Sequence, residues 1–150
     1  MTKEPMRKAT TGLVIQCYRE KYRIQRDIDE FQLEILEIET EMSGLAHHGT
    51  DMSAEQLASP FPMPSTVSPT HDDQRMLDLI ERKAELEARI DWLVYNLKMA
   101  GMVSKLKSED QSMMHDVYHS PKKLEDIAYE YGYHVNSVHP HLRRELDKVL

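Results

Sequence analysis

The sequence is poor in the residues and patterns that build β-sheets. Only 5 glycines and 2 phenylalanines occur among its 150 residues, and no segment alternates apolar with polar residues as a half-buried strand does. These deficits exclude a β-sandwich or a β-barrel. Apolar runs are also short. None approaches the roughly 20 residues that span a bilayer, so no transmembrane helix is predicted. The first residues lack the apolar core of a signal peptide, so we expect no membrane attachment.

Cysteine and net positive charge are lacking as well. Cys17 is the only cysteine, which excludes an internal disulfide framework and is typical of a reducing compartment, so a cytoplasmic location is expected. The formal net charge is −7 at pH 7, which is not the balance of a strongly basic nucleic-acid-binding protein. The charge must therefore be considered segment by segment.

Two segments, 13–45 and 72–101, predict long helices. Their apolar residues recur at steps of three and four, close to the average of 3.5 that keeps one seam of a helix against a partner. The expected seam residues are Ile24, Ile28, Phe31, Ile35, Ile38 and Met42 in the first segment and Leu79, Leu86, Ile90, Leu93 and Leu97 in the second. Gly44 and Gly101 lie where the two helices are expected to end.

Features outside the seams bear on the partners of these helices. Lys83 interrupts the second seam, as a residue that fixes register or oligomeric state does. Beside that seam runs a second apolar stripe, which predicts contact with more than one partner. The stripe consists of Leu77, Ile80, Ala84, Ala88, Trp92 and Tyr95.

The segment between the two helices, 46–71, contains four of the 7 prolines and predicts an extended linker, and residues 1–12 predict a flexible N-terminus. Two seams joined by a linker favour an antiparallel hairpin within one chain. A parallel dimer through one or both helices fits the same periodicity. The oligomer that we expect is a homodimer.

Residues 103–150 predict a small domain of three short helices. Ser108 and Gln111 have the spacing of a capping box at the start of the first. A tight turn joins the second helix to a third over 135–149, which is typical of a helix-turn-helix motif. Its expected core residues are Leu124, Ile127, Ala128, Gly132, Val138, Leu142 and Leu146. The predicted fold is all-α, a long helical hairpin or coiled coil followed by a small C-terminal helix-turn-helix domain.

Polar residues between these core positions are expected to face outward and to bind double-stranded DNA. Asparagine can read adenine through two hydrogen bonds in the major groove, and arginine reads guanine or binds phosphate. The candidate DNA-binding residues are Lys122, Lys123, Asn136, Ser137, His139, His141, Arg143 and Arg144. Because acidic residues balance the basic ones over 103–150, one such module predicts weak, salt-sensitive binding, which favours a dimer or a partner that adds affinity.

The string LEDIAYEYGYHVNSV at 124–138, followed by LRREL at 142–146, resembles the helix-turn-helix of sigma-factor region 4 in the form found in phage transcription regulators. This resemblance covers about residues 108–150. The whole layout is similar to small proteins of phages and prophages of Gram-positive bacteria, which place a helical hairpin before a sigma-like helix-turn-helix. Some of those proteins activate late genes. The matching second helix is 71–98, with ELEARID at 85–91.

What this resemblance implies is DNA binding and transcriptional control inside a bacterial host cell, with RNA polymerase or a sigma factor as a further partner. His134 and Lys123 stand where the family pattern often has a capping serine or threonine. Pro140 lies beyond the first turn of a helix that begins at Val135, where it would cost about 3 kcal/mol. That helix is therefore expected to begin later, to kink, or to open with a 3₁₀ turn.

No catalytic site, cofactor or metal site is expected. His115 and His119 share one predicted helix face, and His139 and His141 flank Pro140, but a metal site needs three or four converging ligands. The sequence has no glycine-rich phosphate loop and no nucleophile with its base. An enzyme is therefore not predicted.

These observations predict a DNA-binding transcriptional regulator, encoded by a phage or prophage, whose coiled coil dimerises or binds polymerase. Three alternatives fit the same residues. A small terminase-like packaging protein would form a large ring. A protein-only adaptor or inhibitor would use its acidic surface without DNA. A structural coiled-coil protein would retain its function without residues 103–150.

Overall fold

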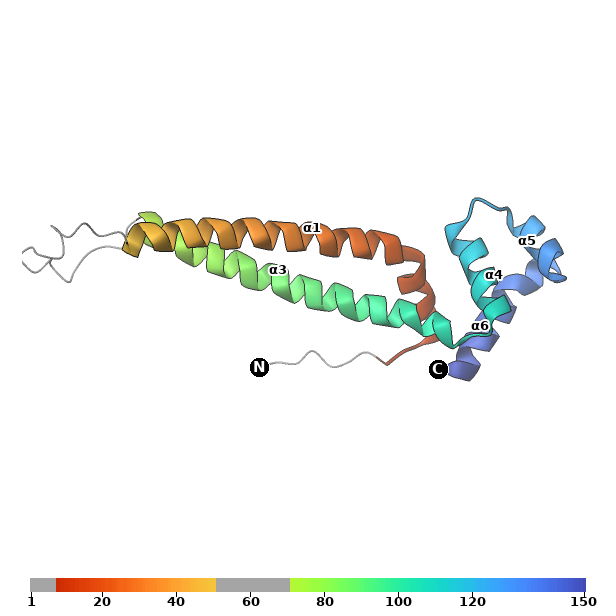
Figure 1. Cartoon of the computed structure of the whole chain (residues 1–150). Helices are drawn as coiled ribbons and strands as arrows, with labels where there is room; N and C mark the ends of the chain where they lie inside the picture. Colours follow the sequence, from red (N-terminus) through yellow and green to blue (C-terminus); the bar gives the residue numbers. More distant parts are fainter. Residues whose placement is uncertain (1–7, 51–70) are drawn as a thin grey trace, which may run out of the picture. The chain divides into compact units, whose positions relative to one another are not determined.

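The computed structural model describes residues 8–50 and 71–150, and the described residues form helices without a strand (Figure 1). The two long helices are α1 (Thr11–Thr50) and α3 (His71–Gly101). The shorter elements are the 3₁₀ helix η1 (Met102–Lys105), α4 (Ser108–His119), α5 (Leu124–Tyr131), the 3₁₀ helix η2 (Val135–Ser137) and α6 (Val138–Val149). The all-α prediction is confirmed. None of the helices in these ranges is both long and apolar enough to cross a membrane.

Helix α1 extends further than the pattern predicted, since residues 46–50 are helical. Gly44 lies inside this helix, and Gly101 has a right-handed φ of −64°, so neither provides a left-handed helix end. A glycine costs only about 1 kcal/mol inside a helix, which neighbouring contacts can offset. The linker and N-terminus predictions for 51–70 and 1–7 lie outside the described residues.

The chain divides into two compact units, and the first, Asp27–Trp92, is an antiparallel hairpin of α1 and α3 (Figure 1). Arg75 donates to both carboxylate oxygens of Glu41, at 2.8 and 3.0 Å. Arg82 lies 3.1 Å from Glu34. Residue numbers thus rise along α3 while they fall along α1. Of the two arrangements that fit the periodicity, the structure has the hairpin within one chain.

A narrow apolar core runs between the two helices of the hairpin. Ile38, Leu79 and Leu86 are buried in it. Phe31, Ile35, Met42 and Leu45 are partly buried and pack against these three. Elsewhere along the helices, Ile24 and Ile28 are buried, and Ile90, Leu93 and Leu97 are half-buried.

Lys83, which interrupts the apolar seam of α3, has its charge matched across the hairpin. Its Nζ atom lies 3.2 Å from Oε1 of Glu39 on α1 and 3.8 Å from Glu87 on its own helix. Part of the second stripe on α3 is exposed, since Leu77 and Ile80 show 54% and 47% of their surface.

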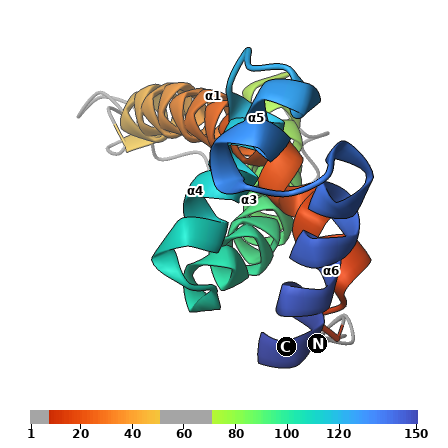
Figure 2. The ribbon, with the colours of Figure 1, turned by 90° about the vertical axis from the view of Figure 1, so that its right-hand side faces the viewer.

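The second unit combines residues 93–150 with the first turns of α1 (Figure 2). Its buried core contains Val14, Ile15, Cys17, Tyr18, Met99, Ala100, Val103, Leu106, Met113, Met114, Ile127, Ala128, Val138, Leu142 and Leu146. We call this part of the chain the C-terminal unit. It is larger than the predicted domain 103–150, because three short helices bury little apolar surface without further cover.

Gly132 reverses the chain after α5. Its φ of 76° is the only positive value among the described residues. The N–H of Tyr133 donates to the carbonyl of Ala128 at 2.8 Å, and that of Gly132 donates to the carbonyl of Tyr129 at 3.2 Å. These bonds close the end of α5 as a left-handed glycine cap does.

We expect Gly132→Ala to lower the free energy of unfolding by about 1–2 kcal/mol, because a Cβ is strained in the left-handed region. Urea denaturation measures this loss. Gly101→Ala is the matched control, since its φ of −64° suits any residue and no atom lies within 4 Å of the added Cβ. The control should be neutral or slightly stabilising. Equal losses in the two variants would contradict the assigned turn.

The start of α6 accommodates Pro140. The 3₁₀ turn η2 comes first, and α6 then begins at Val138, so the proline lies in the first turn, where N–H groups have no intrahelical partner. A later start and a 3₁₀ turn, two of the three expected solutions, are both present. His134 caps η2, because its Nδ1 accepts the Asn136 N–H at 3.3 Å.

The predicted capping box at the start of α4 is wrong. The Gln111 N–H donates to the carbonyl of Lys107 at 2.9 Å, where a capping box would have the side chain of Ser108 as acceptor. The Gln111 side chain does reach back, but it donates to the carbonyls of Leu106 and Ser104, at 2.7 and 3.1 Å. It thereby holds the connection between η1 and α4.

Candidate nucleic-acid interface

Helices α5 and α6, joined by the turn at Gly132, form a helix-turn-helix pair. Val138, Leu142 and Leu146 recur every four residues along α6 and are at most 1% exposed. They share one core with Ile127 and Ala128 of α5. Because one side of α6 is committed to this core, its other side faces solvent.

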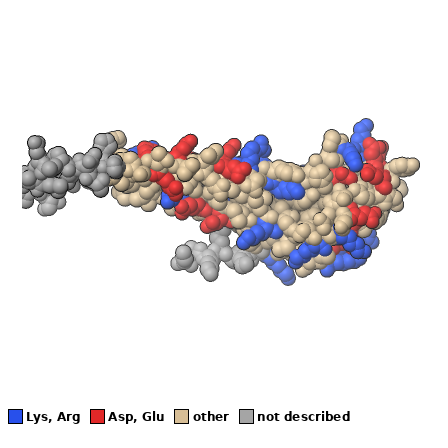
Figure 3. Space-filling view, viewed as in Figure 1, with Lys and Arg blue, Asp and Glu red and all other residues tan. Residues whose placement is uncertain are grey.

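Most of the predicted DNA-binding residues lie on that solvent side or beside it. The exposed members are Lys122, Lys123, Asn136, Ser137, His139, Arg143 and Arg144. Arg143 and Arg144 make no ion pair with any residue that the structure describes. Figure 3 shows Lys and Arg side chains gathered over the region of α6. The exposed side of α6 is thus locally basic although the chain is acidic overall.

Lys122 is exposed, but its charge is already paired. Its Nζ atom lies 3.1 Å from Glu130 and 3.6 Å from Asp116, and the hydrogen bond to Glu130 is the main reason that its pKa is raised. The Tyr131 hydroxyl donates to the same Asp116 carboxylate at 2.9 Å. Burial, and then this hydrogen bond, raise the pKa of Tyr131 to about 12. Lys122 therefore joins α4 to α5, and phosphate binding by this residue would have to break its ion pairs.

The predicted outward position of His141 is wrong. Its Nε2 atom lies 2.8 Å from Oδ1 of Asp110, and the two side chains are only 13% and 8% exposed. The ring also lies against that of Tyr133, with 4.6 Å between centroids. His141 comes three residues after Val138 and one before Leu142, so the helical period places it at the edge of the core. It is a structural residue of the C-terminal unit.

The first turns of α1 are held on α4 by polar and aromatic contacts. Nε2 of His119 lies 2.7 Å from the carbonyl oxygen of Tyr18. Burial lowers the pKa of His119, which favours the neutral ring, and its Nε2–H can donate to that carbonyl. Tyr18 stacks edge-to-face on Tyr118 at 6.2 Å, and burial raises the pKa of Tyr18 to about 12.

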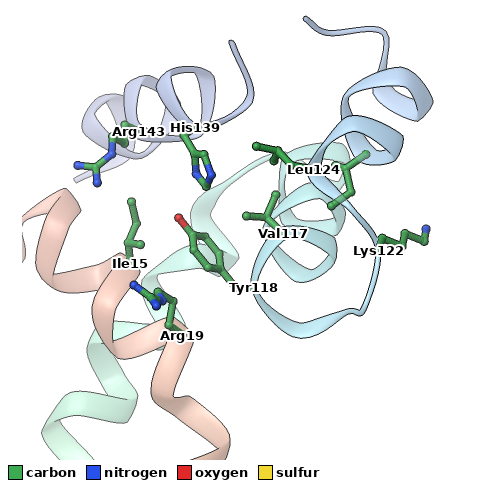
Figure 4. Close-up of a pocket in the computed structure, with 9 residues that line it drawn as sticks. Ile15, Arg19, Val117, Tyr118, Lys122, Leu124, His139 and Arg143 are labelled. Atoms are coloured by element: carbon green, nitrogen blue, oxygen red, sulfur yellow. The ribbon is translucent and has the colours of Figure 1, made fainter. Parts of the chain in front are cut away.

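A groove of about 620 Å³ lies beside α6 and brings α1 to the candidate interface (Figure 4). Its lining residues are Ile15, Arg19, Val117, Tyr118, Lys122, Leu124, Ile127, His139 and Arg143. The Tyr118 hydroxyl points into the space between Ile15 and His139, whereas Lys122 points away from it. Burial raises the pKa of Tyr118. The positive charges of Arg143 and Arg19 lower it, but by less than burial raises it. We call this feature the α1–α6 groove.

Arg19 is the residue of this region that the sequence patterns missed. It lies in a segment that reads as coiled coil, far in sequence from the helix-turn-helix. The available signal was that Val14, Ile15 and Tyr18 are apolar but lie off the seam, which indicates a second contact for the start of α1.

Within 8–46 and 71–150, no group of three His, Cys, Asp or Glu side chains is placed to hold a metal ion. The arrangement offers donors and cations on the surface, which suits binding of an anionic polymer. A scan against protein-family models found no match. Searches of curated proteins and of solved structures found none either.

Proposed function

We propose that the protein is a DNA-binding transcriptional regulator that uses α5 and α6 as a helix-turn-helix. The observation that carries this proposal is the division of α6 into two sides. One side is buried with α5, and the other presents Arg143 and Arg144 without acidic partners among the described residues. That is the form of a recognition helix, which is held by its core side and enters the major groove with its polar side.

The two arginines and the residues before α6 have different roles in this proposal. Asn136 and Ser137 lie in η2, at the N-terminal end of α6, which is the end that reaches base edges in helix-turn-helix complexes. Arg144 lies on the solvent side of α6 and can bind guanine or phosphate. Regulation of phage or prophage genes through RNA polymerase or a sigma factor belongs to the same proposal and is supported by the resemblance to region 4.

The hairpin has the complementary role of dimerisation or of binding to polymerase. Leu33 and Leu36 on α1 are 62% and 59% exposed, and Leu77 and Ile80 on α3 are about half exposed. Exposed leucine and isoleucine side chains at this density are typical of helices that contact another protein. A partner or a second copy would also add the affinity that one weakly charged DNA-binding module lacks.

Replacing Arg143 and Arg144 together by alanine tests the proposal. We expect DNA affinity to fall about 30-fold at fixed salt, since each arginine contributes charge-assisted hydrogen bonds, and we expect the salt dependence to become shallower. Fluorescence anisotropy with DNA from the source genome measures both. The matched control replaces the exposed Lys105 and Lys107, which removes the same charge outside the helix-turn-helix. If both double variants bind DNA like the unchanged chain, α6 is not the DNA-binding helix.

A protein-only adaptor is the second candidate, and the exposed apolar residues of the hairpin together with the net charge of −7 favour it. It predicts that the chain captures its partner equally well with or without the two arginines. It also predicts no DNA binding at low salt.

A further inference from the structure

We propose that Arg19 of α1 and Arg143 of α6 together bind one backbone phosphate of the DNA. This inference rests on the proposed function and adds to it a binding residue from outside the helix-turn-helix. Its basis is the α1–α6 groove, in which residues 124 positions apart in the sequence line one surface (Figure 4).

Arg19 and Arg143 line two neighbouring hollows of the surface together. Besides the α1–α6 groove, Arg19, Arg143 and Ile15 line an adjoining hollow of about 440 Å³. Their helices are tied together there, since the Thr11 hydroxyl of α1 donates to Asp147 of α6 and Ile15 is buried in the common core. These contacts hold the turns of α1 that precede Arg19 against α6.

The positive charge of Arg19 and Arg143 has no ion-pair partner among the described residues. Arg19 and Arg143 are exposed, and neither forms an ion pair within the described part of the chain. Two other cations of the same helices are paired, since Arg23 lies 3.0 Å from Glu20 and Lys148 lies 3.0 Å from Glu145.

Among the described residues, no Asp or Glu lines the α1–α6 groove, and the acid that lines the adjoining hollow is Glu20, whose carboxylate is paired with Arg23. Two cations at one groove without a counterion favour an anionic ligand.

A phosphodiester is the anion that these groups fit. The planar guanidinium donates to two oxygens at once, and each phosphate of the DNA backbone presents two non-bridging oxygens. The Tyr118 hydroxyl and the His139 ring, 6.1 Å from the Tyr118 ring, add hydrogen-bonding groups to the same groove. Because the groove borders α6, the phosphate would belong to the strand beside the major groove that α6 enters.

The proposal gives different residues of the interface the roles of phosphate binding and base reading. Phosphate contacts fix the position of the protein on the duplex and carry no sequence information directly. Arg143 then sets position with Arg19, and base reading falls to Asn136, Ser137 and Arg144. Loss of Arg19 should accordingly weaken binding to every DNA sequence by the same factor.

Arg19→Gln in the full chain tests the inference, with binding measured by anisotropy on two unrelated duplexes over a range of salt. We expect about tenfold weaker binding to both duplexes. The slope of log K against log salt should lose about 0.9 of its magnitude, the contribution of one phosphate. Arg19→Lys keeps the charge and should keep most of the slope.

The matched control is Arg23→Gln, one helical turn further along α1, which removes an equal charge from a residue paired with Glu20. It should leave affinity and slope unchanged.

The outcomes separate the two proposals. If the unchanged chain binds DNA and Arg19→Gln has the same slope, the shared phosphate is overturned while the helix-turn-helix proposal stands. A loss confined to one duplex would also overturn it, because that is the signature of base reading. If the unchanged chain binds no DNA at low salt, both proposals fail. Equal thermal melting of the three arginine variants and the unchanged chain shows that altered binding does not come from unfolding.

Discussion

Val14→Asp is expected to lower the free energy of unfolding of the C-terminal unit by about 3–5 kcal/mol, because it buries a carboxylate without a partner. Val14 is fully buried in α1, 0% exposed, and belongs to the core that also contains Met113 and Leu142. A carboxylate at this site either stays charged in an apolar environment or takes up a proton, and both options cost stability. Guanidinium denaturation followed by circular dichroism measures the loss.

Gln16→Asp is the control for that variant. It adds the same charge two residues further along α1, at an exposed position, and should change stability by no more than about 0.5 kcal/mol. A small effect at both positions would mean that the first turns of α1 do not belong to the C-terminal unit. DNA binding should also be lost with Val14→Asp, since α6 depends on the same core.

Asp110→Ala is expected to cost about 3 kcal/mol, because it removes one member of a buried hydrogen-bonded pair. His141 is only 13% exposed in the unchanged chain, and without Asp110 its Nε2 atom would keep, of its hydrogen-bonding neighbours among the described residues, the Tyr133 hydroxyl at 3.4 Å. Asp110 lies on α4 and His141 on α6, so the pair joins α4 to the last helix of the C-terminal unit. Asp110→Asn keeps an oxygen acceptor at this place and should lose less.

Glu109→Ala serves as the matched comparison for Asp110→Ala. Glu109 is exposed and also lies in the first turn of α4, so its loss should cost less than about 1 kcal/mol through the helix dipole alone. Urea denaturation of the three variants gives the ranking. If Asp110→Ala is no more harmful than Glu109→Ala, the pair with His141 does not hold α4 to α6.

Elements whose signals are local could be predicted from the sequence. The spacing of apolar residues such as Leu79 and Leu86 predicts a helix with one buried side. This prediction does not depend on the rest of the chain. Gly132 indicates the turn between α5 and α6 because a left-handed residue in that place is nearly always glycine. For Pro140, the sequence predicted a later helix start, a kink or a 3₁₀ turn. These options could be predicted because a proline clashes only with the helical turn that precedes it.

Features that depend on distant parts of the chain could not be predicted. The heptad period is the same for an antiparallel hairpin and a parallel dimer, and the ion pair between Arg75 and Glu41 becomes visible only in three dimensions. The same holds for His141, whose partner Asp110 lies 31 residues away. Arg19 was missed for this reason too, because only the packing of α1 against the C-terminal unit brings it to α6.

The central claim is that this chain binds DNA through α6. The most direct test is an anisotropy titration of the full chain with fragments of its source genome while the salt concentration is raised. We predict tight binding to one fragment, with log K falling linearly with log salt at a slope of about −3 or steeper. Absence of binding to every fragment at low salt would contradict the claim and would favour the protein-only adaptor.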